Sequence, residues 1–136
     1  MSGIINSAGS RSGVIGTTEL DYEEGTWTGA IAVGGGTVAQ EWYTKIGNIV
    51  HGGFIVSFDA TGGGGTEYVT GLPFTRTAGD FNIGCYVGFN TSGLAIFAGI
   101  AASATQVGYY SWSGTALSAE DLKSKRVDMS FTYPAL

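Results

Sequence analysis

Short runs of apolar residues alternate along this chain with polar, glycine-rich breaks such as GGG, ATGGGG and NTSG. About eight short strands, with turn signals every 8–12 residues, predict an antiparallel β-sandwich or barrel. The expected strands are Thr26–Val33, Glu41–Ile46, Ile49–Phe58, Glu67–Thr70, Phe81–Phe89, Leu94–Ala101, Gln106–Trp112 and Arg126–Tyr133. The segment TALSAEDLKSK predicts one short helix, because Ser118 can cap it and Asp121 follows three residues later, a weak capping box.

Residues 1–18 depart from this pattern, since they are rich in Gly, Ser, Asn and Thr. They carry two small apolar pairs, Ile4-Ile5 and Val14-Ile15. Such segments are commonly frayed termini. The other reading is an extended arm that docks on a neighbouring subunit through these four residues, because a solvated segment has little use for them. We therefore predict a docking arm over residues 1–18 and a β-sandwich domain over residues 19–136.

The stretch WYTKIGNIVHGG predicts a β-hairpin whose turn residues are Gly47 and Asn48. Glycine first fits a type II′ turn, which needs a positive φ at its first central residue. The turn predicts these opposite pairs: Ile46–Ile49, Lys45–Val50, Thr44–His51, Tyr43–Gly52 and Trp42–Gly53. Two aromatic rings would then cover the backbone of two glycines, as in aromatic rescue. The stretch is interpreted as a folding device without chemistry of its own.

Composition narrows the function classes. Charged residues make up 12% of the chain, about half the usual share, and 24 of 136 residues are glycine, against an average of roughly 7%. The net charge is −5, much of it from ELDYEE, and no basic stripe of a nucleic-acid binder is present. The longest apolar run, Ala95–Ala102, is far shorter than the roughly 20 residues that span a bilayer. An assembly subunit is favoured, with no nucleic acid and no membrane insertion.

Residues suited to catalysis or metal binding are few. His51 is the only histidine, and Cys85 is the only cysteine, within an apolar strand where a thiol usually packs as a small hydrophobe. No G-x-S-x-G motif accompanies them, and ELDYEE lacks the frame of a calcium loop. Two carboxylates for glycoside hydrolysis can come from anywhere in a sequence. Enzymes that cleave polysaccharide need a long cleft, however, and this chain is small for one, so a glycan-cleaving enzyme ranks third. No catalytic residue, metal or cofactor is expected.

Aromatic residues give the strongest indication of binding. The segment GYYSWSG places Tyr109, Tyr110 and Trp112 near a strand end. Exposed rings at loop ends can stack on sugar rings, so these three form a candidate glycan or partner surface. Core packing is the alternative role for such residues. The run Leu94–Ala101 is apolar on both faces, which indicates burial on two sides and an oligomer interface.

Four motifs, LDYEEGTWTG, WYTKIGNIV, GLPFT and SFTYPAL, occur in this order over most of the chain. Together they resemble a module of tailed-bacteriophage virion proteins, often the C-terminal part of tail-fibre or other appendage proteins. The resemblance implies a non-enzymatic β-sandwich, often of jelly-roll type and often trimeric, that is exposed on the particle. Only residues 1–18 precede the module here, where a fibre tip would follow a shaft. This departure favours a capsid decoration (cement) protein.

The expected function is therefore that of a non-enzymatic virion structural protein, made in the host cytoplasm and located on the particle surface. Its expected partners are copies of itself, in a homotrimer, and the major capsid protein or tail proteins. The alternative is the receptor-binding head of a tail fibre or appendage, whose further partner would be a host surface glycan.

Overall fold

Alternating apolar residues form nine strands in the described part of the chain, residues 21–79, 83–101 and 104–136 of a computed structural model. The predicted arm, with Ile4, Ile5, Val14 and Ile15, lies outside the described residues. The strands are β1 (Tyr22–Gly25), β2 (Ala30–Ile31), β3 (Gly36–Ile46), β4 (Ile49–Phe58), β5 (Tyr68–Thr70), β6 (Ile83–Asn90), β7 (Ile96–Ile100), β8 (Gln106–Ser111) and β9 (Arg126–Pro134). One helical turn, α2 (Ala119–Leu122), precedes β9.

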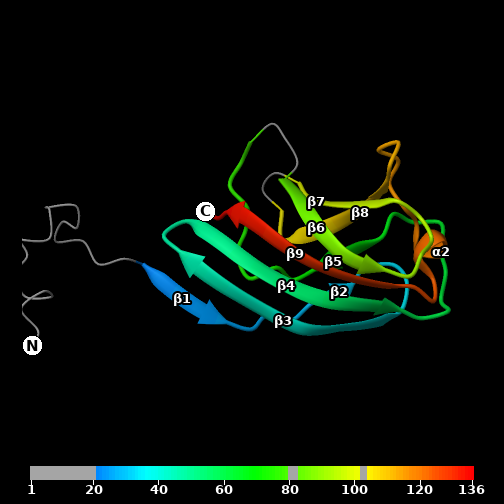
Figure 1. Ribbon diagram of the computed structural model, residues 1–136, viewed down its shortest axis with the longest axis horizontal. Coiled ribbons are helices and arrows are strands. Elements are labelled where there is room, and N and C mark those ends of the chain that lie inside the picture. Colours follow the sequence, from blue (N-terminus) through cyan, green and yellow to red (C-terminus); the bar gives the residue numbers. More distant parts are fainter. Residues whose placement is uncertain (1–20, 80–82, 102–103) are drawn as a thin grey trace, which may run out of the picture.

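The strands form one antiparallel sheet in the order β1-β3-β4-β9-β6-β7-β8-β5-β2, which curls into a half-barrel (Figure 1). Strand β6 joins the two layers. Its first residues, Ile83 to Cys85, pair with β7, and from Tyr86 onward it pairs with β9. The predicted all-β antiparallel fold is confirmed, and the two layers belong to one continuous sheet.

The core lies between the two layers. Alternation along each strand sends every second side chain inward, as in β4, where Ile49 and His51 are exposed and Val50 is fully buried. Both layers contribute large apolar side chains: Val50, Phe54, Val56, Ile100, Val107, Tyr109, Val127, Phe131 and Tyr133. The remaining faces of the layers point outward, toward solvent.

The β3–β4 hairpin has the predicted register at all five pairs. Gly47 has φ +58°, and Asn48 is not among the described non-glycine residues with positive φ, as a type II′ turn requires. Trp42 covers Gly53, since its Nε1 lies 3.0 Å from where a Cβ of Gly53 would be. Gly52 differs from the expectation: its nearest side chain is that of Phe131, while the Tyr43 ring lies over Gly25 of β1.

The predicted strand Thr26–Val33 is wrong, because this segment is divided. The chain pairs as β1 before it and as β2 only at Ala30 and Ile31. Between them Trp27 is buried, with its ring edge-on to Phe54 (centroids 5.3 Å apart) and near Phe131 (6.1 Å). Burial of a large indole outweighs the few ladder hydrogen bonds that a continuous strand would add.

The predicted helix is confirmed as a single turn. Ser118 is its N-cap, and the capping box is complete, since Ser118 Oγ accepts from the Asp121 backbone N–H while the Asp121 side chain accepts from the Ser118 N–H. Leu122 is fully buried on the inner side. Within the described residues, no helix is long and apolar enough to cross a membrane.

Candidate functional site

The outer face of strands β6, β7 and β8 carries a pocket with aromatic walls. Phe97 of β7 lies opposite Tyr110 of β8, and Trp112 follows two residues later on the same face. The Phe97 and Trp112 rings are stacked, with centroids 5.1 Å apart and planes 29° from parallel. Trp112 is 77% exposed and Phe97 46% exposed. Large rings stacked in this way and left open to solvent are a feature of binding surfaces.

Trp112 owes its position to a tight turn after β8. The Gly114 N–H donates to the Ser111 carbonyl (2.8 Å), and the Ser111 N–H donates to the Thr115 carbonyl (2.8 Å). Gly114 has φ +81°, which glycine adopts without the steric cost of a side chain. Tyr110 and Ala116 form a bridge just before and after the turn. A short hairpin loop with a left-handed glycine near its end therefore carries the tryptophan.

The floor of the pocket is made of small residues. Gly84 of β6 pairs with Gly99 of β7, which in turn pairs with Gly108 of β8. The Tyr110 ring lies along its strand over Gly108, with the hydroxyl 2.9 Å from where a Cβ would be. The pocket has a volume of about 370 Å³ and is lined by Gly84, Phe97, Ala98, Gly99, Tyr110, Ser111, Trp112 and Gly114.

Tyr109, predicted to belong to this surface, is a core residue instead. It is fully buried, its ring lies edge-on to Phe58 with centroids 5.7 Å apart, and its hydroxyl donates to Met129 Sδ (3.9 Å). Burial raises the pKa of Tyr109 well above its usual value. Neighbouring residues of a strand point to opposite faces, so Tyr109 and Tyr110 could not both face outward. Sequence reasoning also missed Phe97, because it predicted that the run Leu94–Ala101 is buried on two sides, whereas the outward-facing Phe97 is exposed.

His51 lies exposed on β4, and Cys85 is half-buried on β6. His51 Nδ1 is hydrogen-bonded to Thr132 Oγ1 (2.9 Å), and its ring contacts Trp42 edge-on (5.1 Å). Burial raises the pKa of Cys85 to about 12, which keeps its sulfur in the unreactive thiol form at neutral pH. Within the described ranges, no group of three or more His, Cys, Asp or Glu side chains is placed to hold a metal ion.

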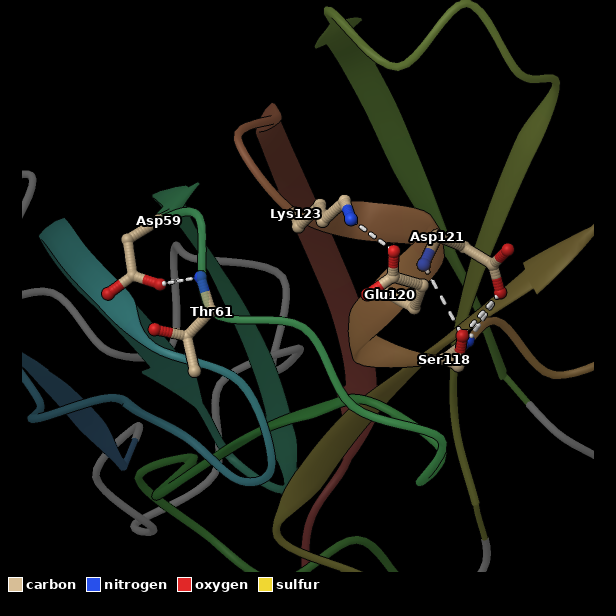
Figure 2. Close-up of polar contacts among 6 residues, drawn as sticks. All are labelled: Asp59, Thr61, Ser118, Glu120, Asp121 and Lys123. Carbon is tan, nitrogen blue, oxygen red and sulfur yellow. Dashed lines mark hydrogen bonds and ion pairs between the residues drawn. The ribbon is translucent and has the colours of Figure 1, made fainter.

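The acidic residues near α2 are engaged in local structural contacts (Figure 2). Asp59 Oδ1 accepts from the Thr61 N–H (2.6 Å), and Glu120 forms an ion pair with Lys123. Hydrogen bonds from Ser118 lower the pKa of Asp121 below its usual value. The Ser118–Asp121 contacts cap the short helix and the Glu120–Lys123 ion pair lies along it, while the Asp59 contact holds the turn after β4.

A buried carboxylate that sequence reasoning did not single out holds the first glycine-rich loop. Glu67 is fully buried. Its Oε1 accepts from the backbone N–H groups of Ala32 (3.2 Å), Val33 (3.0 Å) and Tyr68 (3.1 Å), and its Oε2 accepts from Gly34 (2.7 Å). Successive backbone N–H groups that converge in this way form a concave anion site, which here is occupied by the protein's own glutamate.

A second exposed apolar feature crosses the outer face of the other layer. Tyr22, Ile46, Ile49 and Pro134 lie opposite one another on β1, β3, β4 and β9, and so form one row on one face. Tyr22 is 56%, Ile46 47% and Ile49 43% exposed. We call these four residues the tip row, because Ile46 and Ile49 flank the β3–β4 turn and Tyr22 and Pro134 pair with them. Trp42 and Tyr86, also exposed, lie two rows further along the same face.

In comparisons with known proteins, no family model, no curated protein and no solved structure matches the chain. The resemblance of its four motifs to phage virion modules therefore stays a prediction.

Proposed function

We propose that this protein is a non-enzymatic structural subunit of a bacteriophage virion, a capsid decoration (cement) protein that docks on the particle surface as an oligomer. The observation that carries the proposal is the tip row, in which four adjacent strands each contribute one apolar residue to a surface that is open to solvent. Contiguous exposed apolar patches on a folded domain mark protein–protein contacts. The order of the four motifs supports the same assignment.

The tip row also lies where the predicted arm joins the domain. Tyr22 is the first residue of β1 and pairs with Ile46 beside the turn, and the C-terminal end of β9 lies at the same end of the sheet (Figure 1). An arm over residues 1–18 would therefore begin next to this surface. We propose that the row contacts neighbouring copies and the major capsid protein, and that the arm, which lies outside the described residues, adds to this docking.

The direct test is the copy number of the protein in purified virions, measured by quantitative mass spectrometry. Hundreds of copies per particle are expected for a head decoration protein. A few to a few dozen copies would refute decoration and place the protein on a tail appendage. Removal of residues 2–16 is expected to leave a folded domain that no longer binds to virus particles made without this protein. Unimpaired binding would refute the role of the arm.

The tip row is tested by Ile46→Lys and Ile49→Lys, which place charges in a contact that excludes water. Each is expected to weaken particle binding and self-association, because an unpaired buried charge is costly. Val33→Lys is the matched control, since Val33 has the same 43% exposure as Ile49 but lies in a loop away from the row. Equal binding by all three variants would remove the row from the proposal.

A second candidate function is the receptor-binding head of a tail fibre or appendage, with a host surface glycan as its ligand. The aromatic pocket on β6, β7 and β8 favours it, because stacked rings over a glycine floor are not required for sheet packing. The two functions differ in copy number and in whether the isolated protein binds glycan.

A further inference from the structure

We infer that the pocket between β7 and the turn after β8 binds one uncharged sugar ring, which stacks on Trp112. The site rests on the second function proposed above and needs no particular location on the particle. Its walls, floor and lining hydroxyl each restrict the chemistry of the ligand, and they do so independently.

The walls supply a flat apolar platform. Phe97 packs against one face of the Trp112 indole and holds its plane, while Trp112 keeps 77% of its surface open to solvent. A sugar ring presents a row of C–H groups on one face, and an aromatic ring with a negative face attracts such groups. A tryptophan held in place loses little side-chain entropy when the ligand binds.

The floor lets a ligand reach the backbone. Gly84 is exposed, and a Cβ built on it would meet no atom of the described residues within 4 Å. Gly99, beside it, likewise adds no side chain to the pocket. The volume of about 370 Å³ lies at the small end of ligand pockets. The space suits a single sugar ring. It is not elongated into a cleft of the kind that a polysaccharide chain would fill.

The lining supplies one hydroxyl group on the pocket face and no charge. The Tyr110 hydroxyl lies over Gly108, whereas Ser111 Oγ is engaged with Ser113 Oγ (2.8 Å). A phenolic hydroxyl donates and accepts, which matches the hydroxyls of a sugar. Burial raises the pKa of Tyr110, so this hydroxyl stays neutral. None of the described residues lining the pocket is charged at neutral pH, whereas anionic sugars are held by Arg or Lys.

The test uses the full-length protein and an array of neutral and acidic glycans, followed by saturation-transfer NMR with maltohexaose, cellohexaose, N-acetylchitohexaose and the anionic hexagalacturonate. Saturable binding is expected for at least one neutral sugar and not for the anionic one. Trp112→Ala is expected to weaken that binding roughly tenfold or more, as the loss of an aromatic stack would. Trp42→Ala, which removes an exposed tryptophan outside the pocket, is expected to leave it unchanged.

A blocking variant separates loss of the pocket from loss of the fold. Gly84→Val adds a side chain to the floor at a position with open space and an ordinary φ, so the protein is expected to fold and to lose sugar binding. Gly64→Val is the matched control, because Gly64 also has open space around its Cβ position but lies in a remote loop. Urea denaturation of both variants checks that their stability is equal.

Several results would overturn the inference. The first is that no sugar binds, either on the array or in the NMR experiment. The second is that neutral and anionic sugars bind equally well, and the third is that Gly84→Val still binds a neutral sugar. A fourth is that Trp112→Ala or Gly84→Val abolishes particle binding or self-association without any sugar being bound, since the pocket would then be a protein contact. Copy number in virions is measured separately, so failure of the sugar site is distinguishable from failure of the structural role.

Discussion

Glu67→Gln is the substitution with the clearest expected effect on stability. The side chains have nearly the same size, so packing is conserved while the charge and the hydrogen bonding change. In the wild type, both carboxylate oxygens accept, Oε1 from three backbone N–H groups and Oε2 from Gly34. An amide has one acceptor and one donor group. In either orientation of the glutamine, its NH₂ faces at least one buried backbone N–H.

The magnitude follows from what is lost. A hydrogen bond to a charged group contributes about 1.5–3 kcal/mol, and a buried donor left without a partner costs about 1–3 kcal/mol. Losing the bond at Gly34, the better orientation, therefore lowers the free energy of unfolding by about 3 kcal/mol. With a urea m-value of about 1.5 kcal/mol/M, the midpoint falls by about 2 M. The loop from Ala32 to Gly34 should also lose protection from amide exchange.

Urea titration followed by tryptophan fluorescence measures this change, because Trp27 is buried in the core and reports its loss. Amide exchange at Val33 and Gly34 reports the loop itself. Glu24→Gln is the control: Glu24 is exposed and accepts only from the nearby Tyr22 hydroxyl in the described structure, so its midpoint should not move. A Glu67→Gln midpoint equal to that of the control would refute the claim that Glu67 holds the loop.

Three further predictions concern single positions. Gly36→Ala should lower the free energy of unfolding by roughly 3 kcal/mol or more, because Gly36 has φ +140° and a Cβ there would lie 2.1 Å from a backbone oxygen. Gly47→Ala should lower it by only roughly 1–2 kcal/mol, because Gly47 has φ +58° and open space among the described residues. Urea titration measures both changes. Burial raises the pKa of the Cys85 thiol from the ordinary 9.0 to about 12, so the unfolded chain releases this proton at lower pH than the folded protein. The free energy of unfolding, measured by denaturation at different pH values, should therefore fall as pH rises from about 9 to 12. Cys85→Ala should flatten this slope. Ser118→Ala should cost about 1 kcal/mol and raise the pKa of Asp121 toward its usual value, as followed by NMR titration.

Sequence alone was sufficient wherever neighbours along the chain decide the geometry. The Gly47-Asn48 turn determines the register of β3 and β4, because a two-residue loop allows the flanking strands to pair in only one register. The helix cap at Ser118 is equally local, since both partners of the capping box lie within three residues. The all-β antiparallel class follows from the period of the apolar residues and the spacing of the turns.

Contacts between distant segments were decided only by the tertiary structure. Which face of β8 points inward depends on the layer that packs against it, so Tyr109 is core and Tyr110 lines the pocket although both have the same side chain. Trp27 interrupts the first predicted strand because aromatic residues of β4 and β9 surround it.

The two sites of interest have the same origin. Glu67 finds three of its four donors 33 to 35 residues earlier in the chain, and Phe97 meets Trp112 only because β7 and β8 pair in one register. Residue types and local periodicity carry the strand pattern and the turns. The free energy of burial is shared among residues far apart in sequence, and it selects which side chains are left on the surface to bind.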